Sequence, residues 1–124
     1  MALILIIDDS AYMRQTIRGI LRNDGYEIRE AEDGVKGLQE IKTHPPDCII
    51  LDLIMPGIDG FKILKVLSEE RSRIPVVVVT ADIQESVRRQ CLELGAASFI
   101  NKPPKEEELR AAIRNALTAK RETA

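Results

Sequence analysis

The 124-residue chain contains very few aromatic residues: it has no tryptophan, and two tyrosines and two phenylalanines make up 3% of it. Surfaces that stack nucleic-acid bases are built from aromatic rings, so this composition argues against one. Positive charge is not in excess either, because 18 Lys and Arg face 20 Asp and Glu and leave a net charge of −2. Nucleic-acid-binding domains carry a clustered basic excess, and we therefore expect no nucleic-acid partner.

Long hydrophobic runs and cysteine pairs are also missing. The apolar run Leu3–Ile7 is far shorter than the roughly 20 residues that span a bilayer, and no secretion signal precedes it. Cys48 and Cys91 are 43 positions apart and form no CxxC pair, which is typical of buried thiols in a reduced compartment. We expect a cytoplasmic protein that has no membrane partner.

The length fits a single domain over residues 1–124. Two domains would have roughly 60 residues each, a size at which a hydrophobic core is marginal. The content of 44% hydrophobic and 31% charged residues is that of a globular protein. Leu117 is expected near the end of the last helix, before a polar tail at 118–124, so no separate output domain is expected.

Short apolar segments alternate with helical patterns five times along the chain. This alternation predicts parallel strands joined by right-handed crossovers, with helices on both faces of one sheet. The predicted strands are Leu3–Ile7, Tyr26–Ala31, Cys48–Leu51, Val76–Val79 and Ala97–Ile100. The helical patterns run through Met13–Leu21, Val35–Ile41, Phe61–Leu67, Val87–Leu94 and Leu109–Leu117.

Strand polarity predicts the order of the sheet. The first, third and fourth strands are apolar throughout, as expected where helices cover both faces. The second strand alternates, and the fifth is short and ends in polar residues, so both are placed at the edges. These features predict an α/β fold of the (βα)₅ type, with a doubly wound parallel sheet of order 2-1-3-4-5, as in flavodoxin-like proteins.

Polar residues follow four of the predicted strands. Asp8 and Asp9 follow the first, Asp52 the third, Thr80 the fourth and Lys102 the fifth. In such sheets ligands bind beyond the carboxyl ends of the strands, so these groups should meet at one rim. Three neighbouring carboxylates repel each other, and a divalent cation together with the lysine would relieve that repulsion. Oxygen-only ligands favour Mg²⁺.

A carboxylate beside Mg²⁺, with an ammonium and a hydroxyl in reach, suits attack on phosphorus. Phosphoryl transfer depends mostly on positioning and on neutralising the phosphoryl oxygens. Asp52 is the predicted nucleophile, which would become an aspartyl-phosphate. The residues by themselves therefore predict a Mg²⁺-dependent phospho-accepting site.

The ordered set also resembles a known family. Asp8-Asp9, the segment DLIMPGIDG at 52–60, Thr80-Ala81 and Lys102-Pro103 resemble the signature of receiver domains of two-component response regulators, including the single-domain, CheY-like type. The likeness covers essentially the whole chain, and the ordered set is far more specific than any of its motifs.

This resemblance implies that Asp52 accepts a phosphoryl group from a phosphohistidine on a sensor histidine kinase. It implies that Asp9 and Asp52 ligate Mg²⁺ directly, that Asp8 acts largely through water, and that Ile54 offers its backbone carbonyl. The protein would then be a signalling module that catalyses only its own phosphorylation and dephosphorylation, rather than an enzyme with separate substrates.

The resemblance also assigns a switch. Thr80 and Lys102 would each bind a phosphoryl oxygen, Phe99 would rotate as Thr80 moves, and the bond before Pro103 would be cis. The signal would pass to an effector protein through the face formed by the fourth helix, fifth strand and fifth helix. We expect a monomer or a weak, phosphorylation-dependent dimer.

Four positions depart from the common pattern: Ile54, the acidic Asp82 two residues after Thr80, Phe99, and Pro104 after Pro103. Ile54 is apolar where some relatives have a side chain that orients the attacking water, which predicts slow self-dephosphorylation. Phe99 lacks a tyrosine hydroxyl, so its switching would depend on packing alone.

Three alternative functions stay open. One is a phosphorelay intermediate that passes the group on to another histidine. A second is a Mg²⁺-dependent phosphatase of small molecules. Phosphatases of the haloacid dehalogenase type, however, place a DxD pair after the first strand, where this chain has the adjacent pair Asp8-Asp9. The third is a receiver that binds partners without phosphorylation, against which the intact signature set argues.

Overall fold

The computed structural model describes residues 1–123, with side chains described through Lys120, and forms one five-stranded sheet. All strand pairs are parallel, and the order is β2-β1-β3-β4-β5. This confirms the fold predicted from the sequence. The strands are β1 (Leu3–Ile7), β2 (Glu27–Ala31), β3 (Cys48–Leu51), β4 (Val76–Thr80) and β5 (Ser98–Asn101). The helices are α1 (Ala11–Leu21), α2 (Gly34–Thr43), α3 (Gly60–Glu69), α4 (Glu85–Glu93) and α5 (Glu106–Thr123).

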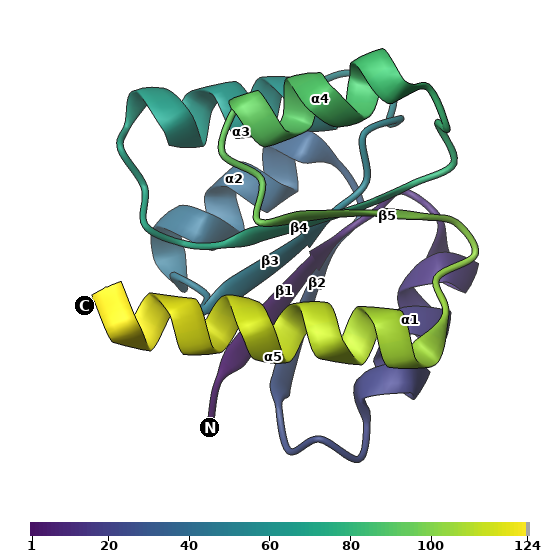
Figure 1. Cartoon of the computed structure of the whole chain (residues 1–124), viewed down its shortest axis with the longest axis vertical. Coiled ribbons are helices and arrows are strands. Elements are labelled where there is room, and N and C mark those ends of the chain that lie inside the picture. The colour runs from purple at the N-terminus through teal and green to yellow at the C-terminus, as the bar shows by residue number, and fades with distance from the viewer. Residues whose placement is uncertain (124) are drawn as a thin grey trace.

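Helices cover both faces of the sheet, α1 and α5 on one side and α2, α3 and α4 on the other (Figure 1). Successive side chains of a strand point to opposite faces, so a strand covered on both sides must be apolar at every position. In β1, Ile4 and Ile6 pack in the core beneath α1 and α5, whereas Leu5 and Ile7 pack in the core beneath the other three helices. This double burial explains the uninterrupted apolar runs.

Polar caps begin three of the helices at the carboxyl edge of the sheet. The side chains of Ser10, Asp33 and Asp59 each accept a hydrogen bond from the backbone N–H three residues later, at 3.1, 2.8 and 3.0 Å. Such caps stabilise helix starts because the first N–H groups have no partner within the helix. The first residue of α4 follows Gln84, whose side chain makes no capping bond.

The predicted ends of some elements were wrong. Strand β2 begins one residue later than predicted, and β5 covers Ser98–Asn101 instead of Ala97–Ile100. Helix α5 continues to Thr123 rather than ending near Leu117. The polar residues of that last segment include good helix formers, so loss of the apolar pattern does not end the helix. Lys120 also reaches Asp47, at 3.5 Å.

Two further observations bear on the sequence predictions. Cys48 and Cys91 are both buried free thiols, as predicted. Among the helices at residues 1–123, none combines the length and the apolar character that crossing a bilayer requires.

Candidate functional site

Three aspartates meet at the carboxyl edge of the sheet. Asp8 and Asp9 follow β1 and Asp52 follows β3, the neighbouring strand. One carboxylate oxygen from each lies within 4.8 Å of the other two. Asp8 and Asp52 are only 2% and 3% exposed, whereas Asp9 lies open to solvent. The structure thus brings together the three acids that the sequence predicted to share a rim.

Lys102 bridges the two buried acids. It follows β5, and its Nζ lies 3.0 Å from Asp8 Oδ2 and 3.3 Å from Asp52 Oδ2. Its side chain is 17% exposed, so the stem is covered while the ammonium faces both carboxylates. One cation is therefore shared by two buried anions, which leaves the site with an excess of negative charge.

This charge distribution shifts two pKa values. Burial is the main reason why the pKa of Asp52 lies above its usual range, and the negative charge of Asp8 raises it further, against the opposing charge of Lys102. Burial alone would lower the pKa of Lys102, but its hydrogen bond to Asp8 and the charges of both carboxylates outweigh that effect and raise it. Lys102 therefore stays charged at neutral pH.

The backbone around Asp8 is fixed by the start of α1. The Ser10 N–H donates to Asp8 Oδ1 at 2.8 Å, and the Arg14 guanidinium donates to the Asp8 carbonyl at 2.7 Å. Arg14 was not predicted from the sequence, because an arginine in the first turns of a helix is ordinarily a solvated side chain. It also pairs with Glu30 at 2.9 Å, so it links β2 to the end of β1.

The loop after β3 folds back against Asp52. The Ile54 N–H donates to Asp52 Oδ1 at 3.3 Å, and the Ile54 side chain is 61% exposed. At the start of α3, a Cβ on Gly60 would lie 2.3 Å from the Asp52 carbonyl oxygen. Only glycine fits such a close approach, and the sequence pattern contained Gly60 without indicating this contact.

Thr80 lies at the end of β4, fully buried. Its Oγ1 accepts a hydrogen bond from the Asp82 N–H at 3.3 Å, and its carbonyl accepts from the Lys102 N–H at 2.8 Å. Phe99, on β5, is partly buried and packs against the core beneath α2, α3 and α4. The Lys102–Pro103 peptide bond is cis.

The donor set fits a hard divalent cation. It offers carboxylate oxygens alone, without sulfur or nitrogen ligands, and Asp9 leaves one side open to solvent. Mg²⁺ prefers such oxygen ligands and keeps several of its waters. The three aspartates can therefore hold Mg²⁺, and Lys102 can contact an anion bound next to it.

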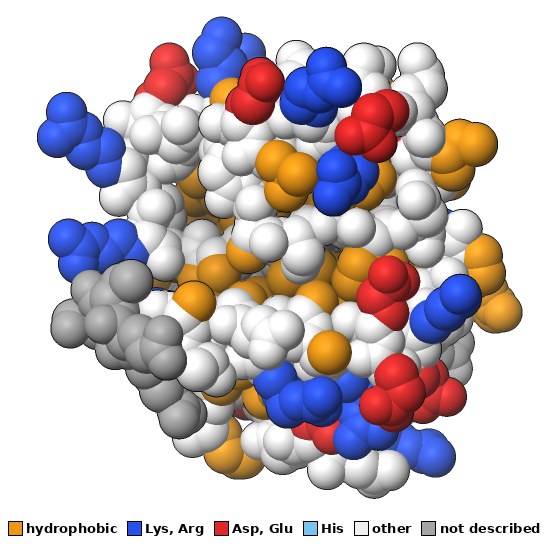
Figure 2. Space-filling model, viewed as in Figure 1, with side chains coloured by type: hydrophobic (Ala, Val, Ile, Leu, Met, Phe, Trp, Pro, Cys, Tyr) orange, Lys and Arg blue, Asp and Glu red, His pale blue; other side chains and the backbone are white. Residues whose placement is uncertain are grey.

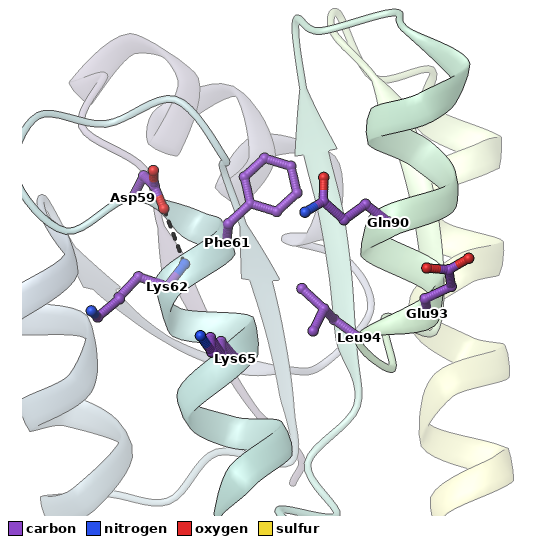
Figure 3. A pocket seen from close by; sticks show the side chains of 7 residues that line it. All are labelled: Asp59, Phe61, Lys62, Lys65, Gln90, Glu93 and Leu94. Atoms are coloured by element: carbon purple, nitrogen blue, oxygen red, sulfur yellow. Dashed lines mark hydrogen bonds between the residues drawn. The ribbon is translucent and has the colours of Figure 1, made fainter.

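A separate hollow of about 530 Å³ lies between α3 and α4 (Figure 3). Phe61, Gln90 and Leu94 point into it, and Lys62 and Lys65 lie along its α3 side. None of the acidic-site residues lines it. The space between these helices is thus distinct from the predicted site.

Comparisons with known proteins identify one family of similar chains. Residues 4–114 match the family described as response regulator receiver domain. Chemotaxis protein CheY of Bacillus subtilis (strain 168) is 35% identical over 115 residues, which are 92% of this chain and 96% of that protein. Response regulator MprA of Mycobacterium sp. (strain KMS) is 36% identical over 111 residues, which are 90% of this chain but 48% of that protein. The chain thus spans about half the length of MprA.

Solved structures show the same likeness. A response regulator receiver domain protein from Clostridium thermocellum has a TM-score of 0.92 and 28% identity, with 100% of both chains covered. Chemotaxis protein CheY4 of Vibrio cholerae has a TM-score of 0.86 and 28% identity, covering 94% of this chain and 99% of that one.

Proposed function

Because this chain belongs to the family of response regulator receiver domains, we propose that Asp52 accepts a phosphoryl group from a phosphohistidine of a sensor histidine kinase. The observation that carries the proposal is the position of Lys102 Nζ, within 3.3 Å of carboxylate oxygens of both Asp8 and Asp52. A cation placed in this way is ready to contact an oxygen of a phosphoryl group on Asp52.

The transfer exchanges one bond to phosphorus for another. An Asp52 carboxylate oxygen forms a bond with phosphorus while the bond from the donor imidazole nitrogen to phosphorus breaks. The imidazole keeps the electron pair of that bond and takes up a proton from solvent. Lys102 and the Thr80 hydroxyl each contact a phosphoryl oxygen, which offsets the charge that Asp52 gains.

Asp9 and Asp52 are the residues that would hold Mg²⁺ directly, with Asp8 acting through water and Ile54 through its backbone carbonyl. The ion would supply positive charge beside the phosphoryl oxygens. The chain's own part is to fix the carboxylates: the Ser10 N–H orients Asp8, and the Ile54 N–H orients Asp52.

Phosphorylation would act as a switch. In this proposal Thr80 moves toward the phosphoryl group, Phe99 rotates into the space vacated, and the face formed by α4, β5 and α5 binds an effector protein. Figure 2 supports such a surface: hydrophobic side chains lie in the hollow between α4 and α5, and charged side chains of both signs surround it. We propose a cytoplasmic protein that is a monomer or a weak, phosphorylation-dependent dimer.

The test is the intact mass of the protein after incubation with acetyl phosphate and Mg²⁺. We expect the wild type to gain one phosphoryl group and Asp52→Asn to gain none. Asp47→Asn is the matched control, because Asp47 precedes β3 and so lies at the amino-terminal ends of the strands, away from Asp52. This variant should be phosphorylated like the wild type. A wild type that stays unmodified would contradict the proposal, and turnover of many phosphate esters would favour a phosphatase instead.

A further inference from the structure

We infer that Asn101 is a positioning residue that holds the loop after β4, and with it the Thr80 hydroxyl, in the arrangement in which Thr80 Oγ1 accepts from the Asp82 N–H. The inference rests on the proposed function, since it assigns to Asn101 a part in the movement of Thr80. Asn101 lacks a place in the signature described above, and its exposed side chain at the end of β5 would ordinarily be a solvated one.

The structure gives that side chain a specific partner. Asn101 is the register partner of Thr80 across β4 and β5. Its Nδ2 donates a hydrogen bond to the Asp82 carbonyl at 2.9 Å, across 19 positions of the sequence. A side chain on one strand thus holds the loop that leaves the neighbouring strand.

Asp82 is fixed at three points. Its N–H donates to Thr80 Oγ1 at 3.3 Å, its carbonyl accepts from Asn101, and its carboxylate accepts from the Gln84 N–H at 3.0 Å. Gln84 is the residue that precedes the first turn of α4. One residue therefore connects the Thr80 hydroxyl, the end of β5 and the start of α4.

The bond to Asn101 opposes movement of Thr80. For Thr80 Oγ1 to turn toward a phosphoryl oxygen, it must leave the Asp82 N–H, or Asp82 must move with it. If Asp82 moves, the bond from Asn101 to its carbonyl breaks. Few other contacts of the described residues hold the start of α4: the Gln84 side chain makes no capping bond, and Cys91 is buried while Val87 packs only partly against the core. A net hydrogen bond of typical strength changes such an equilibrium about fivefold.

The test compares Asn101→Ala and Asn101→Asp with the wild type. The first variant removes the donor, and the second keeps the shape of the side chain but cannot donate when ionised. Asn115→Ala is the matched control, because Asn115 is an exposed asparagine on α5. Two quantities are measured: the exchange rate of the Asp82 N–H by NMR in the metal-free protein, and the affinity for beryllofluoride, a phosphoryl mimic, in the presence of Mg²⁺.

We expect both Asn101 variants to exchange the Asp82 N–H about fivefold faster and to bind beryllofluoride about fivefold more tightly. The amides of Val77–Val79 and the control variant should be unchanged. Unchanged Asp82 exchange, weaker beryllofluoride binding, or opposite effects of the two variants would overturn the inference. If neither the wild type nor any variant binds beryllofluoride, the proposed function fails. Faster exchange of the Asp82 N–H in the Asn101 variants would still support the inference that Asn101 fixes the loop after β4.

Discussion

Replacing Lys102 by methionine tests how strongly the acidic site depends on the ammonium that pairs with its two buried carboxylates. The Lys102 Nζ lies 3.0 Å from Asp8 Oδ2 and 3.3 Å from Asp52 Oδ2. At an effective dielectric constant of about 20, each contact corresponds to about 5 kcal/mol of Coulomb attraction. The cost of taking the three charges out of water offsets much of this attraction.

Methionine keeps most of the length of the side chain but removes the ammonium that pairs with Asp8 and Asp52, whose carboxylates then keep only their bonds from the Ser10 and Ile54 N–H groups. Removing one member of a buried ion pair typically costs about 3–5 kcal/mol. Because Lys102 is not fully covered, we expect Lys102→Met to lower the free energy of unfolding by about 3 kcal/mol at neutral pH without metal.

This deficit should depend on pH in one direction. Burial and the negative charge of Asp8 raise the pKa of Asp52 in the folded protein. Protonation of Asp52 therefore stabilises the folded state below the usual carboxyl pKa, and this stabilisation is lost as pH rises through the raised pKa. Lys102→Met removes the positive charge that opposes the rise in the pKa of Asp52, so that pKa should rise further in the variant. In mild acid Asp52 takes up a proton in the folded variant, and the deficit of Lys102→Met should shrink.

The assay is urea unfolding followed by circular dichroism, at neutral pH and in mild acid, with EDTA and then with Mg²⁺. Lys65→Met is the control, because Lys65 is exposed on α3, and it should change stability by no more than about 0.5 kcal/mol. Mg²⁺ should restore part of the stability that Lys102→Met loses. Equal losses for the two variants, or a Lys102→Met deficit that stays the same in acid, would refute the reasoning.

Three further outcomes are expected. Mg²⁺ at about 100 times its dissociation constant should stabilise the wild type by about 2.7 kcal/mol. In a thermal shift assay, Asp52→Asn should lose most of that stabilisation. An equal gain in the wild type and in Asp52→Asn would contradict the metal site. Ile54→Asn should speed loss of the phosphoryl group about tenfold or more, through better orientation of water, as followed by intact mass; an unchanged half-life would count against this role. Gly60→Ala should cost about 1–3 kcal/mol in urea unfolding, because its Cβ meets the Asp52 carbonyl, whereas Gly19→Ala has open space and should not destabilise.

The sequence predicted the acidic cluster because its residues follow strand ends. Asp8 and Asp52 come directly after apolar segments, Lys102 follows the last residue of β5, and the parallel sheet brings the carboxyl ends of its strands together. The central positions of β1, β3 and β4 were predictable for a similar reason, since burial on both faces leaves an uninterrupted apolar run. Both predictions depend on features that recur along the chain.

Other parts of the site depend on single contacts that no periodic pattern contains. The approach of Gly60 to the Asp52 carbonyl and the bond from Asn101 to the Asp82 carbonyl are set by loop conformation. The sharing of Lys102 between two acids needs distances that the order of residues does not give. The end of α5 was missed because polar residues with good helix propensity can continue a helix without an apolar stripe.

The central claim is that residue 52 itself carries the phosphoryl group, and reductive trapping tests it most directly. Borohydride reduces an acyl phosphate to an alcohol, so an aspartyl-phosphate becomes homoserine. After reaction with acetyl phosphate and Mg²⁺, then borohydride, peptide mass spectrometry should find homoserine at position 52 and aspartate at positions 8 and 9. Homoserine at another position, or none anywhere, would contradict the account.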